Sequence, residues 1–185
     1  LADSKDVIIR RLEINNILVT MVYIEGMVDT NAVSQYIIKP LKQEPFNSSS
    51  SEKQIIDLLQ KGNVYFASQY ERNNLGEVIN DIMSGSTAII FDNENLAYTF
   101  EAKGFEKRSV AEPTNENVIK GSKDAFIEVL SVNTALCRRK IRTHNLVIEQ
   151  TIVGKQTLTK VAILYLKNVA NADMVKEVKK RLESI

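Results

Sequence analysis

Residues 22–29 read VYIEGMVD and predict the end of a buried strand, a sharp exit and the start of a helix. Gly26 suits the exit because glycine adopts positive φ without a steric penalty, and Asp29 is a favoured helix N-cap. The same order of events returns at residues 164–171, LYLKNVAN, where asparagines replace both the glycine and the cap. Another candidate strand precedes each copy. We therefore predict a strand–strand–helix unit that occurs twice.

The rest of the chain predicts helices and strands in mixed order. Apolar alternation and turn residues predict strands at residues 7–14, 18–24, 64–66, 87–91, 96–100, 105–111, 146–153 and 157–166. Helical spacing and caps predict helices from Asp29 to near Pro40, at 51–60, at 74–83, from Ser122 to about Ile141, and at 172–183. We expect an α/β fold (α+β mixed) of two small lobes, each a mixed sheet with packed helices. The predicted N-terminal α/β subdomain is 1–103, and the C-terminal α/β subdomain is 104–185.

The composition excludes several classes of protein. Of 185 residues, 44% are hydrophobic and 25% are charged, which is ordinary for a globular domain. The net charge of +1 gives no overall attraction to nucleic acid or to an anionic membrane. Cys137 is the single cysteine, so no internal disulfide can form, and a reducing compartment fits. The longest apolar run, Val161–Leu166, is far shorter than the roughly 20 residues of a membrane helix.

The two ends of the chain indicate a fragment. The first residues mix polar and charged types and do not form a signal peptide. The chain begins without methionine and stops directly after a predicted helix. We therefore expect it to be part of a longer protein.

The sequence offers no convincing catalytic or metal-binding set. His144 is the single histidine, and a nucleophile pair with Cys137 is far less common than a packed cysteine and a loop histidine. Residues 154–157, GKQT, lack the rest of a phosphate-binding loop and predict a hairpin turn. Residues 92–95, DNEN, lack the pattern of a calcium loop and predict a turn as well. We expect no enzyme activity, no cofactor and no metal.

The predicted long helix carries the candidate contacts with a partner or ligand. Arg138, Arg139 and Arg142 belong to the densest basic run, which could bind phosphate, nucleic acid or the carboxylates of a partner. The same cations would complement the dipole at a helix C-terminus. We favour partner contact or capping over nucleic acid, because no aromatic residues or second basic stripe accompany the run. Asn133 places an amide on the apolar face, where it must be hydrogen-bonded, either as a tie to a neighbouring loop or as the lining of a cleft.

Two segments resemble the A subunit of GerA-type bacterial spore germination receptors. Residues 112–126, EPTNENVIKGSKDAF, are similar to a family pattern that reads approximately E-P-x-T-E-x-x-V-R-G-P-R-E-G-F, and residues 133–141, NTALCRRKI, are similar to N-T-A-L-I-R-R-R-I. Both ends of the chain also resemble the family. Lys120, Ser122 and Ala125 depart from it, standing where the family has Arg, Pro and Gly. The departures keep a helix start but weaken any claim that these positions bind a ligand.

The resemblance implies a function in germination. This segment would be the N-terminal cytosolic domain of the A subunit, on the core side of the spore inner membrane, and the full protein would continue into membrane helices. With the B and C subunits it would form a receptor that responds to nutrients. Our first hypothesis is a domain for receptor assembly and signal coupling, which includes self-association and exposed contacts at Lys176, Lys179 and Lys180. The alternative is a small-molecule module that binds a nutrient in the cleft between the lobes.

Overall fold

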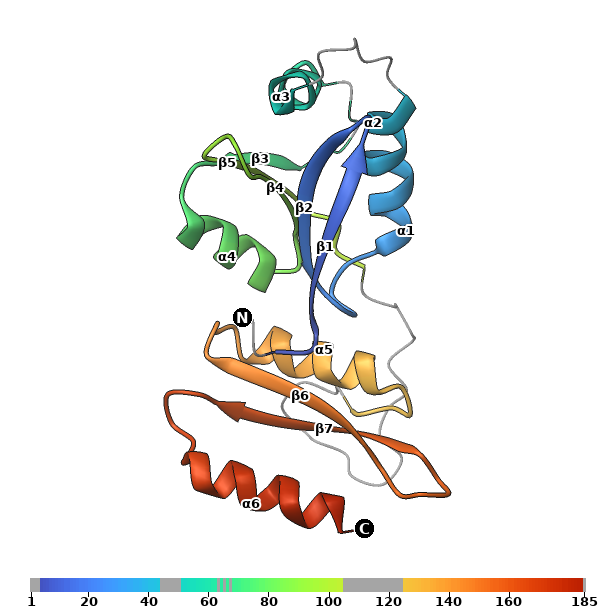
Figure 1. The fold of residues 1–185 in the computed structure, drawn as a ribbon, viewed down its shortest axis with the longest axis vertical. Helices are drawn as coiled ribbons and strands as arrows, with labels where there is room; N and C mark the ends of the chain where they lie inside the picture. The colour runs from blue at the N-terminus through green and yellow to red at the C-terminus, as the bar shows by residue number, and fades with distance from the viewer. Residues whose placement is uncertain are drawn as a thin grey trace, which may run out of the picture. The chain divides into compact units, whose positions relative to one another are not determined.

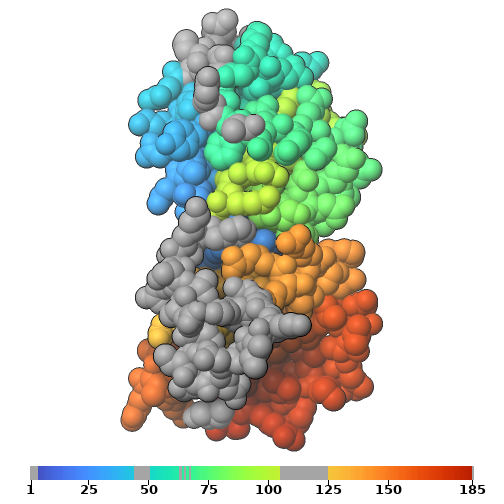
Figure 2. Space-filling view, turned by 180° about the vertical axis from the view of Figure 1, so that it is seen from behind, coloured from blue at the N-terminus to red at the C-terminus, as the bar shows by residue number. Residues whose placement is uncertain are grey.

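The structure is a computed structural model that describes residues 4–43, 51–62, 64, 66, 68–104 and 125–184. These residues form two compact units. The N-terminal unit comprises residues 7–104, and the C-terminal unit comprises residues 4–6 together with 125–184. In Figure 2 the first unit is coloured blue to yellow-green, and residues 125–184 of the second unit are coloured orange to red. Residues 4–6 thus pack with the C-terminal unit, although our boundaries assign them to the first subdomain; the limits of independent domains stay a prediction.

The N-terminal unit is built on a five-stranded sheet with the order β1-β2-β4-β5-β3 (Figure 1). All neighbouring strands in it are antiparallel. The strands are β1 (Val7–Ile14), β2 (Ile17–Ile24), β3 (Gln69–Arg72), β4 (Thr87–Phe91) and β5 (Leu96–Phe100). The predicted α/β class is confirmed, but the described sheets are antiparallel where we expected mixed ones.

Local turn chemistry explains the β1–β2 hairpin. Ile14 pairs with Ile17, which leaves a two-residue loop of Asn15 and Asn16. Both asparagines have positive φ, 50° and 66°. A two-residue loop of this kind matches the twist of the flanking strands, and asparagine tolerates its backbone conformation.

Helices cover both faces of this sheet (Figure 1). A continuous helical segment runs through α1 (Thr30–Val33), the π-helix η1 (Ser34–Ile38) and α2 (Lys39–Gln43). Together with α3 (Glu52–Gln60), it joins the main core on one face, which includes the buried side chains of Val19, Met21, Tyr23, Ile37, Leu41, Ile55, Ile89 and Phe100. The helix α4 (Leu75–Met83) buries Val78, Ile82 and Met83 and contacts β2, β4 and β5.

Two predictions in this unit are wrong at the level of single elements. The first helix does not end near Pro40 but continues to Gln43. A π-turn precedes the proline, with the Lys39 amide bonded to the Ser34 carbonyl, and this altered hydrogen bonding accommodates a residue that has no N–H of its own. The strand expected at residues 64–66 is not found at Val64 or Phe66, and the strand lies at β3 instead.

The C-terminal unit is a two-stranded sheet with two helices. Strands β6 (Leu146–Val153) and β7 (Thr159–Leu166) pair antiparallel. The helices are α5 (Leu130–Lys140) and α6 (Ala172–Glu183). The helix predicted from Ser122 is shorter in its described part, because residues 125–129 are not helical and Val129 is the N-cap of α5. Ser122 itself, and the strand predicted at 105–111, lie outside the described residues.

The repeated strand–strand–helix unit is present in both units. It is β1–β2–α1 in the first and β6–β7–α6 in the second. Asp29 caps α1 by accepting hydrogen bonds from the Asn31 and Ala32 amides, and Asn171 caps α6 by accepting one from the Asp173 amide. The two exits differ, because Gly26 has φ 76° while Asn168 is not among the described residues with positive φ. No described helix is both long enough and apolar enough to cross a bilayer.

Candidate functional site

Arg138 lies in the interior of the C-terminal unit, at the last turn of α5. Its side chain is 0% exposed and forms a two-pronged ion pair with Asp6. Nε donates to Oδ2 at 2.7 Å and Nη2 donates to Oδ1 at 2.9 Å. The planar guanidinium matches a carboxylate in this geometry.

Other polar groups complete this buried network. Arg138 Nη2 donates to Ser4 Oγ at 2.6 Å, and Nη1 donates to the Leu146 carbonyl at 2.7 Å. Ser4 Oγ donates to Asp6 Oδ1 and accepts from the Ile148 amide, both at 2.8 Å. The network therefore fixes residues 4–6 against α5 and β6. Arg138 is committed to this interior role and is not exposed to a partner in this structure.

The other predicted contact residues have different surroundings. Asn133 Oδ1 accepts from the Ile127 amide at 2.8 Å, and Nδ2 donates to the Ile127 carbonyl at 2.6 Å, so the amide ties the start of α5 to the segment before it. Arg142 is exposed, and its Nε donates to the Arg139 carbonyl at 3.0 Å, which satisfies an acceptor at the helix end. Arg139 is half-buried. The geometry brings Arg139 and Arg142 together at one helix end; contact with a partner stays a prediction for them.

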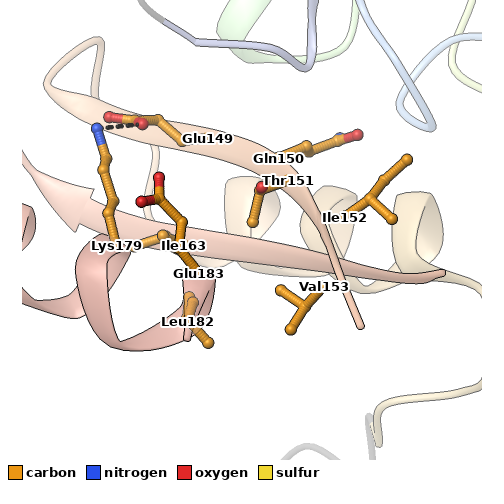
Figure 3. A pocket seen from close by; sticks show the side chains of 9 residues that line it. All are labelled: Glu149, Gln150, Thr151, Ile152, Val153, Ile163, Lys179, Leu182 and Glu183. Carbon is orange, nitrogen blue, oxygen red and sulfur yellow. Dashed lines mark ion pairs between the residues drawn. The ribbon is translucent and has the colours of Figure 1, made fainter. Parts of the chain in front are cut away.

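A groove of about 190 Å³ lies between α6 and the β6–β7 sheet (Figure 3). At one end, Lys179 Nζ of α6 pairs with Glu149 Oε2 of β6 at 2.5 Å. Val153, Ile163 and Leu182 supply apolar lining. The groove thus combines one charged end with an apolar wall, and sequence reasoning did not identify it.

The groove exists because α6 covers the sheet incompletely. None of the residues of α6 is buried, although Val175, Val178 and Leu182 are spaced to face inward. Val178 is 40% exposed, and Ile152, which points away from α6 on β6, is 60% exposed. The C-terminal unit therefore presents apolar side chains that no described element covers.

The shifted pKa values lie elsewhere, in the N-terminal unit. Tyr98 Oη donates to Glu71 Oε2 at 2.6 Å. This hydrogen bond, with a weaker one from Gln60, lowers the pKa of Glu71, while burial and the bond to Glu71 raise the pKa of Tyr98. Arg72 donates to Asp81 at 2.8 Å, and this bond raises the pKa of Arg72. All three shifts favour the ordinary charge state of the group at neutral pH, so these groups are not poised for acid–base chemistry. Their hydrogen bonds connect β3 to β5 and to α4.

The remaining candidates for chemistry do not assemble. His144 is exposed and Cys137 is half-buried. Within the described part of the chain, no group of three or more His, Cys, Asp or Glu residues could hold a metal ion. Gly154 has φ 83° and lies in the β6–β7 loop, as the turn prediction requires.

The loop at residues 92–95 binds an internal carboxylate. Glu52, in the first turn of α3, is 6% exposed. Its oxygens accept from the backbone amides of Asp92, Asn93 and Glu94 and from the Asn93 side chain, at 2.9–3.1 Å. The turn prediction is correct, but local patterns could not indicate the buried glutamate, because the two segments are distant in the chain.

Sequence comparisons place the chain among spore germination proteins. The sequence model of the family described as Bacillus/Clostridium GerA spore germination protein matches residues 1–185. Stage V sporulation protein AF of Bacillus subtilis (strain 168) is 31% identical over 185 residues, which cover 98% of this chain and 36% of that protein. Spore germination protein KA of the same organism is 31% identical over 187 residues, which cover 98% and 34%. The chain thus spans about a third of the length of these relatives.

A solved structure shares the fold. The crystal structure of the N-terminal domain of the A subunit of the Bacillus megaterium spore germinant receptor GerK3 has a TM-score of 0.78 with this chain at 28% identity. The match covers 100% of this chain and 67% of the other. The similarity extends over both units.

Proposed function

Because the chain belongs to the GerA family of spore germination proteins, we propose that it serves a germinant receptor as an assembly and signal-coupling domain of the A subunit. It contacts other receptor subunits, of the B and C type or further A subunits, and helps to convert nutrient arrival into germination. The receptor lies in the spore inner membrane, with this domain on the cytosolic (core) side. Catalysis is not part of the proposed role.

One observation carries the proposal: no described element covers the apolar side chains that α6 presents at its surface. Met174 and Val178, one helical turn apart on α6, are 69% and 40% exposed. Exposed apolar residues that gather at one place are typical of protein interaction sites. Lys176 and Lys180 add exposed cations to the same helix, and charge at an interface favours specificity over non-specific association. We therefore assign the subunit contact to this α6 surface, comprising Met174, Val178 and the groove.

The experiment tests assembly of the full-length receptor in spores. Met174→Ser removes apolar contact area without opening a cavity, because the side chain is already 69% exposed. We expect reduced co-purification of the A subunit with its partner subunits and a weaker response to nutrient. The matched control is Leu75→Ser, which removes a side chain that is also 69% exposed but belongs to α4 of the other unit.

Folding is checked separately. Circular dichroism and thermal melting of the 185-residue chain should be unchanged in both variants. Normal assembly and germination with the α6 surface variant would contradict the proposal. The alternative of a nutrient bound between the lobes stays a prediction, and titration of the chain with a nutrient panel tests it.

A further inference from the structure

A second hollow, of about 150 Å³, lies within the N-terminal unit. Residues of β1, β2 and β4 line one side of it, and residues of α1 and η1 line the other. Three features converge on this hollow: an unpartnered buried hydroxyl, a guanidinium and a π-helix.

The first feature is an unpartnered hydroxyl. Thr87 is 0% exposed, and its Oγ1 has no hydrogen-bond partner among the described residues. Met21 pairs with Ile89 in the β2–β4 register, so Thr87, two residues earlier on β4, lies on the same face as Met21 and lines the hollow. A buried hydroxyl without a partner costs free energy, and a ligand in the hollow would supply one.

The second feature is a cation in an apolar row. Along β1, the core-facing positions are Ile8, Arg10, Leu12 and Ile14, because they alternate with side chains of the opposite face. Arg10 lines the hollow while it remains exposed to solvent, and the described part of the chain offers it no ion pair. A cation among apolar residues on this face of the strand, beside an unpartnered hydroxyl, points to a function.

The third feature is the π-helix. η1 contributes Ser34 and Ile38 to the lining. Isolated π-turns are rare and occur frequently at functional sites, because they re-aim side chains that an α-helix would place elsewhere.

The chemistry of the lining selects the ligand. Arg10 is the one charged residue among those that line the hollow, and no carboxylate lies among them. The Thr30 and Ser34 hydroxyls add polar groups, while Leu12, Val33 and Ile38 provide an apolar wall. A guanidinium with hydroxyl groups suits a carboxylate. The volume corresponds to about five water molecules, which limits the ligand to a short apolar substituent.

We propose that this hollow, the Arg10 pocket, binds a small carboxylate that carries a short apolar group. Arg10 and Thr87 donate hydrogen bonds to the carboxylate, and the apolar wall receives the substituent. The site lies within one unit, unlike the cleft between lobes considered above, and it rests on no part of the α6 surface.

The test uses three probes of similar size on the 185-residue chain: butyrate, butyramide and butylamine. Chemical-shift titration should show saturable changes with butyrate at the amides of Arg10, Ser34 and Thr87. The neutral and cationic probes should bind at least about tenfold more weakly, because they lack the charge that pairs with the guanidinium. Absence of saturable shifts with butyrate, or equal binding of all three, overturns the proposal.

Variants separate binding from folding. Arg10→Gln should weaken butyrate binding about tenfold, whereas Arg11→Gln, on the opposite face of β1, should leave it unchanged. Thr87→Val keeps the shape and removes the unpartnered hydroxyl, so the unliganded protein should melt at the same or a higher temperature while butyrate binds more weakly. Equal losses from Arg10→Gln and Arg11→Gln, or unchanged binding in Thr87→Val, would contradict the assigned roles.

Discussion

At the scale of single residues, the buried pair of Asp6 and Arg138 has the largest expected effect on stability. Asp6→Ala leaves a guanidinium that is 0% exposed without its counter-charge. Breaking such a pair typically costs about 3–5 kcal/mol. We expect the free energy of unfolding, measured by urea denaturation, to fall by that amount.

The controls distinguish this mechanism from general disruption of residues 4–6. Lys5 stands between Ser4 and Asp6 in the chain, but its side chain is exposed. Lys5→Ala should therefore change the free energy of unfolding little. Asp6→Leu combined with Arg138→Met replaces the pair by apolar groups and should recover part of the loss. A double variant as unstable as Asp6→Ala would show that the unpaired charge is not the cause.

Glu71 makes the stability of the N-terminal unit depend on pH at the acid end. Its pKa lies below the usual 4.5, chiefly because Tyr98 donates a hydrogen bond to it. The unfolded state therefore takes up a proton first, so the contribution of Glu71 is complete above about pH 4.5 and is lost as pH falls through the lower folded value. Glu71→Gln should flatten the fall of unfolding free energy below that pH. If the fall is as steep in the variant as in the parent chain, Glu71 is not its cause.

Tyr98 acts in the opposite direction at alkaline pH. Burial raises its pKa above the usual 10.0, so its contribution to stability is complete below that pH and is lost as pH rises above it.

The buried pair of Asp6 and Arg138 illustrates what sequence reasoning could not supply. Arg138 was identified as notable from its basic neighbours, but its partner Asp6 is 132 positions away. Only tertiary packing distinguishes an interior arginine from an exposed one.

At the scale of elements, Glu52 connects α3 to the β4–β5 hairpin. Its carboxylate accepts four hydrogen bonds from residues 92–94. Glu52→Ala leaves these donors without their acceptor, and we expect a loss of about 2 kcal/mol in unfolding free energy. Hydrogen exchange at the amides of residues 92–94 should accelerate.

The matched control for this prediction is Asp173→Ala. Asp173 also stands in the first turn of a helix, α6, but its side chain is 89% exposed. That variant removes a favourable charge near a helix N-terminus and its exposed ion pair with Lys176, each worth at most about 1 kcal/mol. If both variants lose equal stability, the tie to the hairpin is not what Glu52 contributes.

Elements with strong local signals were predictable. Both strands of the 87–100 hairpin and the helix α6 have the bounds expected from turn residues and caps. The edge strand β3 was missed because its sequence, QYER, has little apolar content and its pairing with β5 is set by tertiary contacts. The later start of α5 was missed because an N-cap at Val129 offers no side-chain capping bond.

At the scale of the whole molecule, the chain order and the compact units do not coincide. Residues 4–6 belong to the C-terminal unit, and β1 of the N-terminal unit begins directly after them at Val7. A division drawn along the sequence separates Asp6 from Arg138 and the Lys5 amide from the Ile148 carbonyl, which it bonds at 2.8 Å. Family resemblance could predict the α/β class, but it could not predict that residues 4–6 pack with the C-terminal unit.

Deletion of residues 1–6 tests that organisation. Because the buried network lies in the C-terminal unit, we expect hydrogen exchange to accelerate in α5 and at residues 146–148, with protection retained in β2 and β4. The alanine variant of Asp6 should produce the same pattern more weakly, since it keeps the Lys5 backbone bond. If the deletion instead lowers protection in β2 and β4 as much as in α5, residues 4–6 stabilise both units alike. The two-unit division would then describe compactness without describing how the molecule unfolds.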